Sequence, residues 1–216
     1  TLLFWHDETW VNSGEEKHSI WIDNSGHGRL RKRDGQGPRL AISPMLSKDG
    51  IHESTVGIWE TSKEHNMTSA RFVNWISEAV GTLRAENVNS KICIIVDNAP
   101  WYNELAEETK MSKRAWVEAQ VVQRLNDHQV PYLDIYTKAE LLELADAYAP
   151  KKVFKTDVAA AKFDVDILRL PVRHCVLNPI ELAWAEMKTF IRNNNVTFSL
   201  KDVSVWAKAW LTACDM

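Results

Sequence analysis

The chain has few cysteines, no long apolar run and almost no excess of charge of one sign. Its three cysteines, Cys93, Cys175 and Cys214, form no C-x-x-C pair, which favours a reducing compartment without a disulfide framework or a zinc knuckle. A membrane-spanning helix needs about 18 consecutive apolar residues, and no such run or signal-peptide pattern is present. Apolar content of 45% and charged content of 25% are typical of a globular domain.

The net charge is only −3, from 26 basic and 29 acidic residues, which gives no general attraction to nucleic acid. A local exception is the stretch GRLRKRDGQGPR, residues 28–39, where five Arg or Lys residues accompany one Asp. Such a run is typical of a solvated loop, and it also suits contact with backbone phosphates. The candidate DNA-binding residues here are Arg29, Arg31, Lys32 and Arg33.

The 216 residues are enough for one domain with a full core. Because the sequence opens directly into a strand pattern, we expect it to be a fragment of a longer protein. An amphipathic helix is predicted from about Ser69 and a last one from near Ser199. Before the first helix, short apolar runs separated by turn residues predict strands at residues 2–11, 19–23, 39–46 and 54–60.

The clearest strand is KICIIVDNAP, residues 91–100, in which five apolar residues from Ile92 to Val96 stand in a row. Such a run is typical of a strand buried on both faces of a sheet. Asp97 ends the run, and α/β folds place functional groups at the carboxyl ends of central strands. An equally good interpretation is that Asp97 caps the following Asn-Ala-Pro turn through an Asx-type hydrogen bond.

Residues 104–155 are dense in Lys and Glu and predict two helices, KRAWVEAQVVQRLNDH and KAELLELADAY. We interpret this segment as a helical insertion between the Asp97 strand and the next predicted strand, DVDILRLP, residues 164–171. The paired helices resemble helix-extended-helix modules of the SAP type, some of which bind DNA. A structural or dimerisation role is the alternative for this segment.

The stretch VLNPIELAW, residues 176–184, follows that last strand and has two interpretations. Asn178 suits a helix N-cap, Pro179 suits the first helical position, and Glu181 then completes a capping box. The alternative is that Glu181 is a catalytic acid, in one group with Asp7 on the first strand and Asp97. Three carboxylates close together repel one another unless a cation lies between them, and hard oxygen ligands suit Mg²⁺.

Three stretches carry a resemblance to a known family: HDETWVN around Asp7, DNAPWY around Asp97 and HCVLNPIELAW around Glu181. In this order they resemble the catalytic motifs of the mariner superfamily of DDE transposases, and the similarity runs from about residue 4 to residue 195. The stretches GQGPRLAI, HNMTSARFVNWI and TKAELLEL are similar to the eukaryotic branch with a long spacing between the second and third acids. DNAP together with LNPIE is specific, whereas either alone is weak.

The resemblance implies an α/β, RNase H-like fold over residues 1–216: a mixed sheet flanked by helices, with the helical insertion before the last strand. It implies a Mg²⁺-dependent DNA endonuclease and strand transferase, in which Asp7, Asp97 and Glu181 hold two metal ions and Mn²⁺ can substitute. The implied partners are transposon ends, target DNA and a second copy of the chain, in the nucleus. Flanking the third motif, Arg173 and His174 are further candidates for DNA contact, and a packed or capping role is the alternative for His174.

The sequence departs from the family pattern at three places. Tyr102 stands where members often carry His, and the usual LPPY before the third motif is LPVR, ending at Arg173. Between Asp97 and Glu181 lie 83 residues, more than in the best-known members, and the helical insertion accounts for the excess. The helix-turn-helix domains that recognise transposon ends are expected N-terminal to this sequence, which also explains its mild net charge.

Other acids are weaker candidates for the site. Glu8 follows Asp7, but neighbours on a strand point to opposite faces, so only one of them can join the site, and we choose Asp7. Asp164 and Asp166 precede the last strand and are expected to face solvent. A host-adopted descendant that binds DNA or protein without transposing is the alternative function. A sequence-independent RNase H-type nuclease is disfavoured, because LNPIE after DNAP is typical of transposases.

Overall fold

The computed structural model describes residues 1–15, 38–61, 67–110 and 112–214. The predicted strand at 19–23 and the four candidate DNA-binding residues of the basic stretch, Arg29, Arg31, Lys32 and Arg33, lie outside these residues. In the described residues no helix is both long enough and apolar enough to cross a membrane. The strands are β1 Leu2–His6, β2 Thr9–Asn12, β3 Arg39–Ser47, β4 Gly50–Thr61, β5 Ile92–Val96 and β6 Val165–Arg169, and the α-helices are α1 Ser69–Glu86, α2 Glu118–Asp127, α3 Lys138–Ala147, α4 Lys155–Ala161, α5 Ile180–Asn194 and α6 Leu200–Ala213.

All six strands form one mixed sheet. Strand β3 pairs antiparallel with β4 along one edge and with both β1 and β2 along the other, while β1, β5 and β6 run parallel. The prediction of a single strand at residues 2–11 is wrong in one respect. The strand stops after His6 and resumes at Thr9, which leaves Asp7 and Glu8 in a break.

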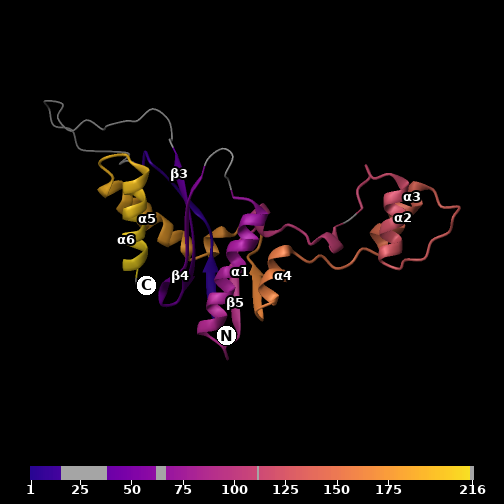
Figure 1. Ribbon diagram of the computed structural model, residues 1–216, viewed down its shortest axis with the longest axis horizontal. Helices are drawn as coiled ribbons and strands as arrows, with labels where there is room; N and C mark the ends of the chain where they lie inside the picture. Colours follow the sequence, from indigo (N-terminus) through magenta and orange to yellow (C-terminus); the bar gives the residue numbers. More distant parts are fainter. Residues whose placement is uncertain (16–37, 62–66, 111, 215–216) are drawn as a thin grey trace.

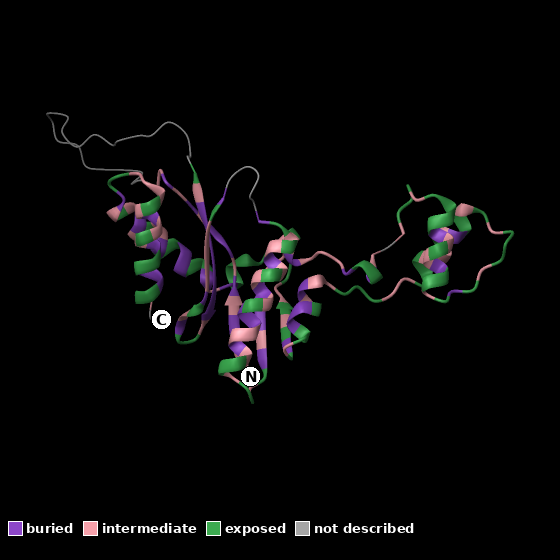
Figure 2. Ribbon diagram, in the orientation of Figure 1, coloured by how far each residue is buried: buried purple, intermediate pink, exposed green. Residues whose placement is uncertain are grey.

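Helices cover both faces of this sheet (Figure 1). On one face α1 and α4 pack against β1, β5 and β6 through a core that includes Phe4, Phe72 and Ile94. On the other face α5 and α6 pack against β2 and β3 through Ile42, Trp184 and other apolar residues. The predicted mixed sheet flanked by helices is thus confirmed, and Figure 2 shows its buried residues along the strands and the helix faces that meet them.

The segment at residues 104–155 extends away from the sheet (Figure 1). Its helices α2 and α3 pack on each other around a small core of their own, made by Val121, Leu125, Val130 and Leu141. Helix α2 begins at Glu118, later than predicted, and the short helix α4 at the end of the segment was not predicted. Most residues of the two paired helices are exposed or half-buried (Figure 2).

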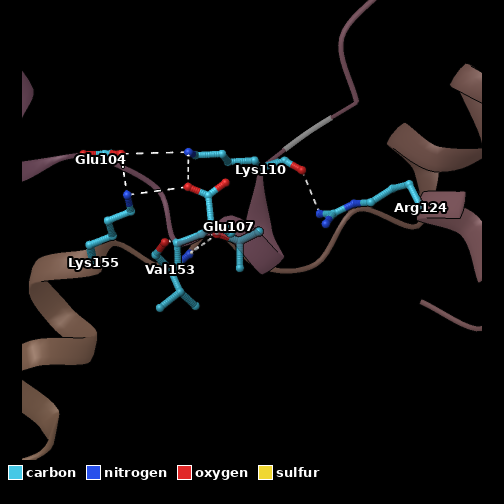
Figure 3. Close-up of polar contacts among 8 residues, drawn as sticks. Glu104, Glu107, Lys110, Arg124, Val153 and Lys155 are labelled. Carbon is cyan, nitrogen blue, oxygen red and sulfur yellow. Dashed lines mark hydrogen bonds and ion pairs between the residues drawn. The ribbon is translucent and has the colours of Figure 1, made fainter. Parts of the chain in front are cut away.

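The base of the helical insertion is closed by hydrogen bonds and ion pairs between its two ends (Figure 3). Nζ of Lys155 lies 2.5 Å from Oε1 of Glu104 and 3.5 Å from Oε1 of Glu107, and Lys110 also contacts both acids. Arg124 on α2 donates to the backbone carbonyls of Glu108 and Lys110, each at 2.7 Å. These contacts fix the entry of the chain into the insertion and its exit from it.

Candidate active site

Asp7 and Asp97 lie side by side because β1 and β5 are parallel neighbours. The register pairs Leu2 with Ile92 and continues in step to Trp5 with Ile95. Extended by two residues, the same register brings Asp7 opposite Asp97, at the carboxyl ends of both strands. The strand order therefore produces the convergence of these two acids that the sequence motifs imply.

The carboxylate of Asp97 accepts a hydrogen bond from the backbone N–H of Ala99 at 3.0 Å. The Asx-type capping predicted for this turn is thus confirmed, and it occupies one of the two carboxylate oxygens. Next to it, Nδ2 of Asn98 donates to the carbonyl of Leu170 at 2.5 Å, which ties the turn after β5 to the end of β6. A capping role and a ligand role are compatible here, because a carboxylate has four acceptor positions.

Glu181 lies in the first turn of α5, and Asn178 connects the start of this helix to β1. Nδ2 of Asn178 donates to the carbonyl of His6 at 3.0 Å, and this side chain is buried. The predicted capping box is wrong, because the backbone N–H of Asn178 donates to Cys175 at 2.8 Å and not to the Glu181 carboxylate. The Asn178 side chain accepts only a long 3.4 Å bond from Ile180 N, so its main partner is the strand.

Burial raises the pKa of Asp7 from 3.8 to about 7, with smaller contributions from neighbouring charges. The His6 imidazole opposes this rise, whereas Glu8, Asp97 and Glu181 add to it by repulsion. The other two motif acids therefore add to the electrostatic cost of ionising Asp7 in the folded chain. A cation bound among them would relieve this repulsion and favour the ionised form of Asp7.

In the described residues no three Asp, Glu, His or Cys side chains converge closely enough to hold an ion as they stand. Asp7 is turned toward Trp184, whose indole N–H donates to it at 3.2 Å, and Glu181 is exposed. Carboxylates that repel one another separate where the local structure allows it. The donor set, three carboxylates at one sheet edge, nevertheless fits a hard divalent cation such as Mg²⁺.

Glu8 is buried on the face opposite to Asp7, among aromatic side chains, with 4% of its surface exposed. Its carboxylate accepts hydrogen bonds from the hydroxyl of Tyr102 and from the indole N–H of Trp101, the latter at 3.3 Å. Its other oxygen lies 3.5 Å from Nε2 of His6. The sequence correctly excludes Glu8 from the side of Asp7 but does not show this buried arrangement. The period-two alternation of Phe4, His6 and Glu8 was the available signal.

The two candidate DNA-binding residues before α5, Arg173 and His174, are both exposed, in the segment between β6 and Glu181. Arg173 has a φ of 67°, in a region uncommon for residues other than glycine, and such conformations occur often at functional sites. His174 is its neighbour. Asp164 and Asp166 are exposed as expected, and they lie at the far end of β6 from these residues, within 3.6 Å and 3.3 Å of Arg84 and Lys91.

Comparison with known proteins connects this site to a family. The family model "DDE superfamily endonuclease" matches residues 2–204. Among solved structures, the Mos1 transposase paired-end complex with the left transposon end matches with a TM-score of 0.60 at 12% identity, covering 99% of this chain and 48% of that one. The Mos1 mariner paired-end complex with Mn matches with a TM-score of 0.58 at 12% identity, with the same coverage.

These comparisons have two consequences. The chain spans about half the length of the solved proteins that it matches, and at this identity the structural likeness concerns the fold. The RNase H-like architecture implied by the motifs is therefore confirmed. The family model matches nearly the whole sequence, including the positions of all three acids. The chain belongs to the DDE superfamily of endonucleases.

Proposed function

We propose that this chain is the catalytic domain of a cut-and-paste DNA transposase that cuts and rejoins DNA with divalent metal ions. The observation that carries the proposal is geometric: the parallel register of β1 and β5 brings Asp7 opposite Asp97, and Trp184, three residues after Glu181 on α5, donates to Asp7. Membership of the DDE endonucleases supports hydrolysis of phosphodiesters. The Mos1 complex with a transposon end motivates transposon DNA as the substrate.

Asp7, Asp97 and Glu181 are the residues that would hold the ions. Bound Mg²⁺ or Mn²⁺ would supply Lewis-acid chemistry, activating water or a 3′-hydroxyl and stabilising the leaving oxygen. The chain's own part is positioning. Trp184 donates to Asp7, the Ala99 N–H donates to Asp97, and Asn178 holds the start of α5 against β1. These contacts hold Asp7 in the break between β1 and β2, the turn that carries Asp97 after β5, and the start of α5 that carries Glu181.

Two of the proposed DNA contacts, Arg173 and His174, follow the carboxyl end of β6, the strand that pairs with the Asp97 strand β5. Arg173 and His174 are exposed between β6 and Glu181, where a phosphate beside the acids would find a positive charge. Arg29, Arg31, Lys32 and Arg33 are proposed as further phosphate contacts. A second copy of the chain, a pair of transposon ends and a nuclear location complete the proposal.

A host-adopted descendant that binds DNA or protein without transposing is the second candidate. The departures from the family pattern at Tyr102 and Arg173 favour it, because Tyr102 binds Glu8, the neighbour of Asp7, and Arg173 stands in the segment before Glu181. Terminal inverted repeats around the gene would favour the mobile element. Their absence, together with a protein that binds DNA without cutting it, would favour the descendant.

A nicking assay on supercoiled plasmid with Mg²⁺ or Mn²⁺ tests the proposed function. The parent protein should relax the plasmid, and Asp97→Asn should abolish the reaction, since the amide keeps the shape and the acceptor for Ala99 N–H but removes the charge. Asp166→Asn is the matched control, because Asp166 is exposed on β6 beside Lys91. A folded Asp97→Asn protein that nicks as fast as the parent would refute the proposal.

A further inference from the structure

We propose that Glu8 is a positioning residue that ties the first motif acid to the second one, an inference that rests on the proposed function. Glu8 follows Asp7 directly in the chain. Its two hydrogen-bond donors, Trp101 and Tyr102, follow Asp97 by four and five residues. One buried carboxylate therefore joins the backbone segment that carries Asp7 to the segment that carries Asp97.

The hydrogen bonds to Glu8 are needed at this place, because the sheet does not hold Asp7 and Glu8 directly. The pairing of β1 with β3 ends at His6, and the pairing of β2 with β3 begins at Thr9, so neither pairing includes Asp7 or Glu8. In the break, neighbouring side chains hold the backbone instead. His6 Nδ1 donates to the carbonyl of Pro44 at 2.9 Å, and Glu8 binds the segment after Asp97. The backbone at Asp7 is thus held by the contacts of its two neighbours, and its side chain accepts the bond from Trp184.

Packing alone does not account for a carboxylate at this place. Glu8 is 4% exposed and Tyr102 is fully buried, and the rings of Phe72 and Trp75 lie against His6 at centroid distances of 5.3 Å and 4.3 Å. A charged group in such surroundings is costly, and an apolar side chain of similar volume would be cheaper or neutral. What a carboxylate adds here is directional hydrogen bonding, because it fixes the positions of Trp101 and Tyr102, the two donors that follow the second motif acid.

The side from which Glu8 acts also suits positioning. Asp7 points toward Trp184 on α5, whereas Glu8 points to the opposite face, toward Trp101 and Tyr102. Glu8 can therefore fix the backbone of Asp7 without competing for a metal ion. Groups that orient metal ligands in this way commonly change metal affinity or activity by about 10- to 100-fold when they are removed.

The test is a titration of the purified protein with Mn²⁺ by calorimetry, because this readout does not depend on cleavage. Tyr102→Phe removes the hydroxyl donor and keeps the ring, and we expect it to weaken Mn²⁺ binding by about 10- to 100-fold. Tyr148→Phe is the matched control, since Tyr148 is 60% exposed on the helical insertion, and it should bind like the parent. Tyr102→His returns a ring N–H donor and should recover part of the lost affinity.

Each outcome decides between the proposals. A folded Tyr102→Phe protein that binds Mn²⁺ like the parent, or a folded Tyr102→His protein that recovers nothing, overturns the tie and leaves the proposed function standing. A parent that binds no Mn²⁺ overturns both. If Tyr102→Phe does not fold, the same titration of Trp101→Phe decides, because this change removes the other donor from a ring that is only partly buried.

Discussion

The indole N–H of Trp184 donates a hydrogen bond to Oδ2 of Asp7 at 3.2 Å, across the boundary between α5 and the break in the first strand. Residues three apart on a helix share a face, so Glu181 lies on the same side of α5 as Trp184, one turn nearer to the start of the helix. Through this contact the third motif is placed against the first. The helical spacing therefore places Glu181 on the face of α5 from which Trp184 contacts Asp7.

The first prediction concerns Asp7 and pH. Since the pKa of Asp7 is raised from 3.8 to about 7 on folding, the folded protein holds more protons than the unfolded chain between these values, and stability falls as the pH rises through this window. Asp7→Asn removes the ionisation and keeps an acceptor for Trp184. Without metal the variant should melt above the parent at pH 8, by about 2–4 °C for each kcal/mol gained by removing the buried charge and the smaller repulsion from its neighbours.

Melting curves from pH 4 to pH 8 measure this difference, which should close toward pH 4, where Asp7 is protonated in the folded parent. Asp49→Asn, at an exposed site beside Lys48, is the control and should follow the parent throughout. Saturating Mn²⁺ at pH 8 should stabilise the parent more than Asp7→Asn. A variant that melts below the parent at pH 8 without metal would contradict the electrostatic account of the site.

A second prediction concerns DNA contact at the segment before α5. Replacing Arg173 by Ala should weaken non-specific DNA binding and lower the slope of log K against log salt by about one for the lost phosphate contact. The triple change of Arg31, Lys32 and Arg33 to Ala should lower it by up to about three. Fluorescence anisotropy at several salt concentrations measures both slopes.

Lys162→Ala is the control for these cations. Lys162 is exposed at the end of α4, before β6 begins, so it lies at the opposite end of that strand from Arg173. Its replacement should leave the slope unchanged. A slope that is the same for Arg173→Ala and the parent would mean that Arg173 is an ordinary surface residue.

A third prediction concerns the helical insertion. Its two ends meet where Thr109 Oγ1 donates to the carbonyl of Val153 at 3.0 Å, and α2 and α3 have their own small core. Replacing residues 112–151 by a short Gly-Ser linker should therefore leave the rest folded, with Mn²⁺ affinity within about twofold of the parent, because the acids lie on other elements. A change in DNA affinity or in the oligomer measured by light scattering would assign the insertion to DNA contact or to dimerisation, respectively.

Much of this architecture could be predicted from the sequence, because local patterns carry it. The apolar run from Ile92 to Val96 indicates a central strand, and the motif order indicates which strand ends bring the acids together. The break at Asp7 and Glu8 was missed, although the polar run from His6 to Thr9 interrupts the apolar residues there. The partners of Glu8 and Asn178 were also missed, because Tyr102 and His6 lie 94 and 172 residues away from them along the chain.

The central claim is that Glu181 is a metal ligand and not a helix-capping residue. Glu181→Gln keeps the shape and could still serve in a cap, but an amide oxygen replaces a hard anionic ligand poorly. The structure already places the backbone N–H of Asn178 on Cys175, so loss of a capping bond should not lower stability. Glu186→Gln, at an exposed site five residues further along α5, is the matched control.

The most direct measurement is the melting temperature of the parent, Glu181→Gln and Glu186→Gln, each with and without Mn²⁺. Without metal, Glu181→Gln should melt level with the parent or slightly above it, because one of three mutually repelling carboxylates has gone. With Mn²⁺, the melting temperature should rise in the parent and in Glu186→Gln but not in Glu181→Gln. An equal rise in all three proteins would contradict the account and return Glu181 to the role of an ordinary residue in the first turn of a helix.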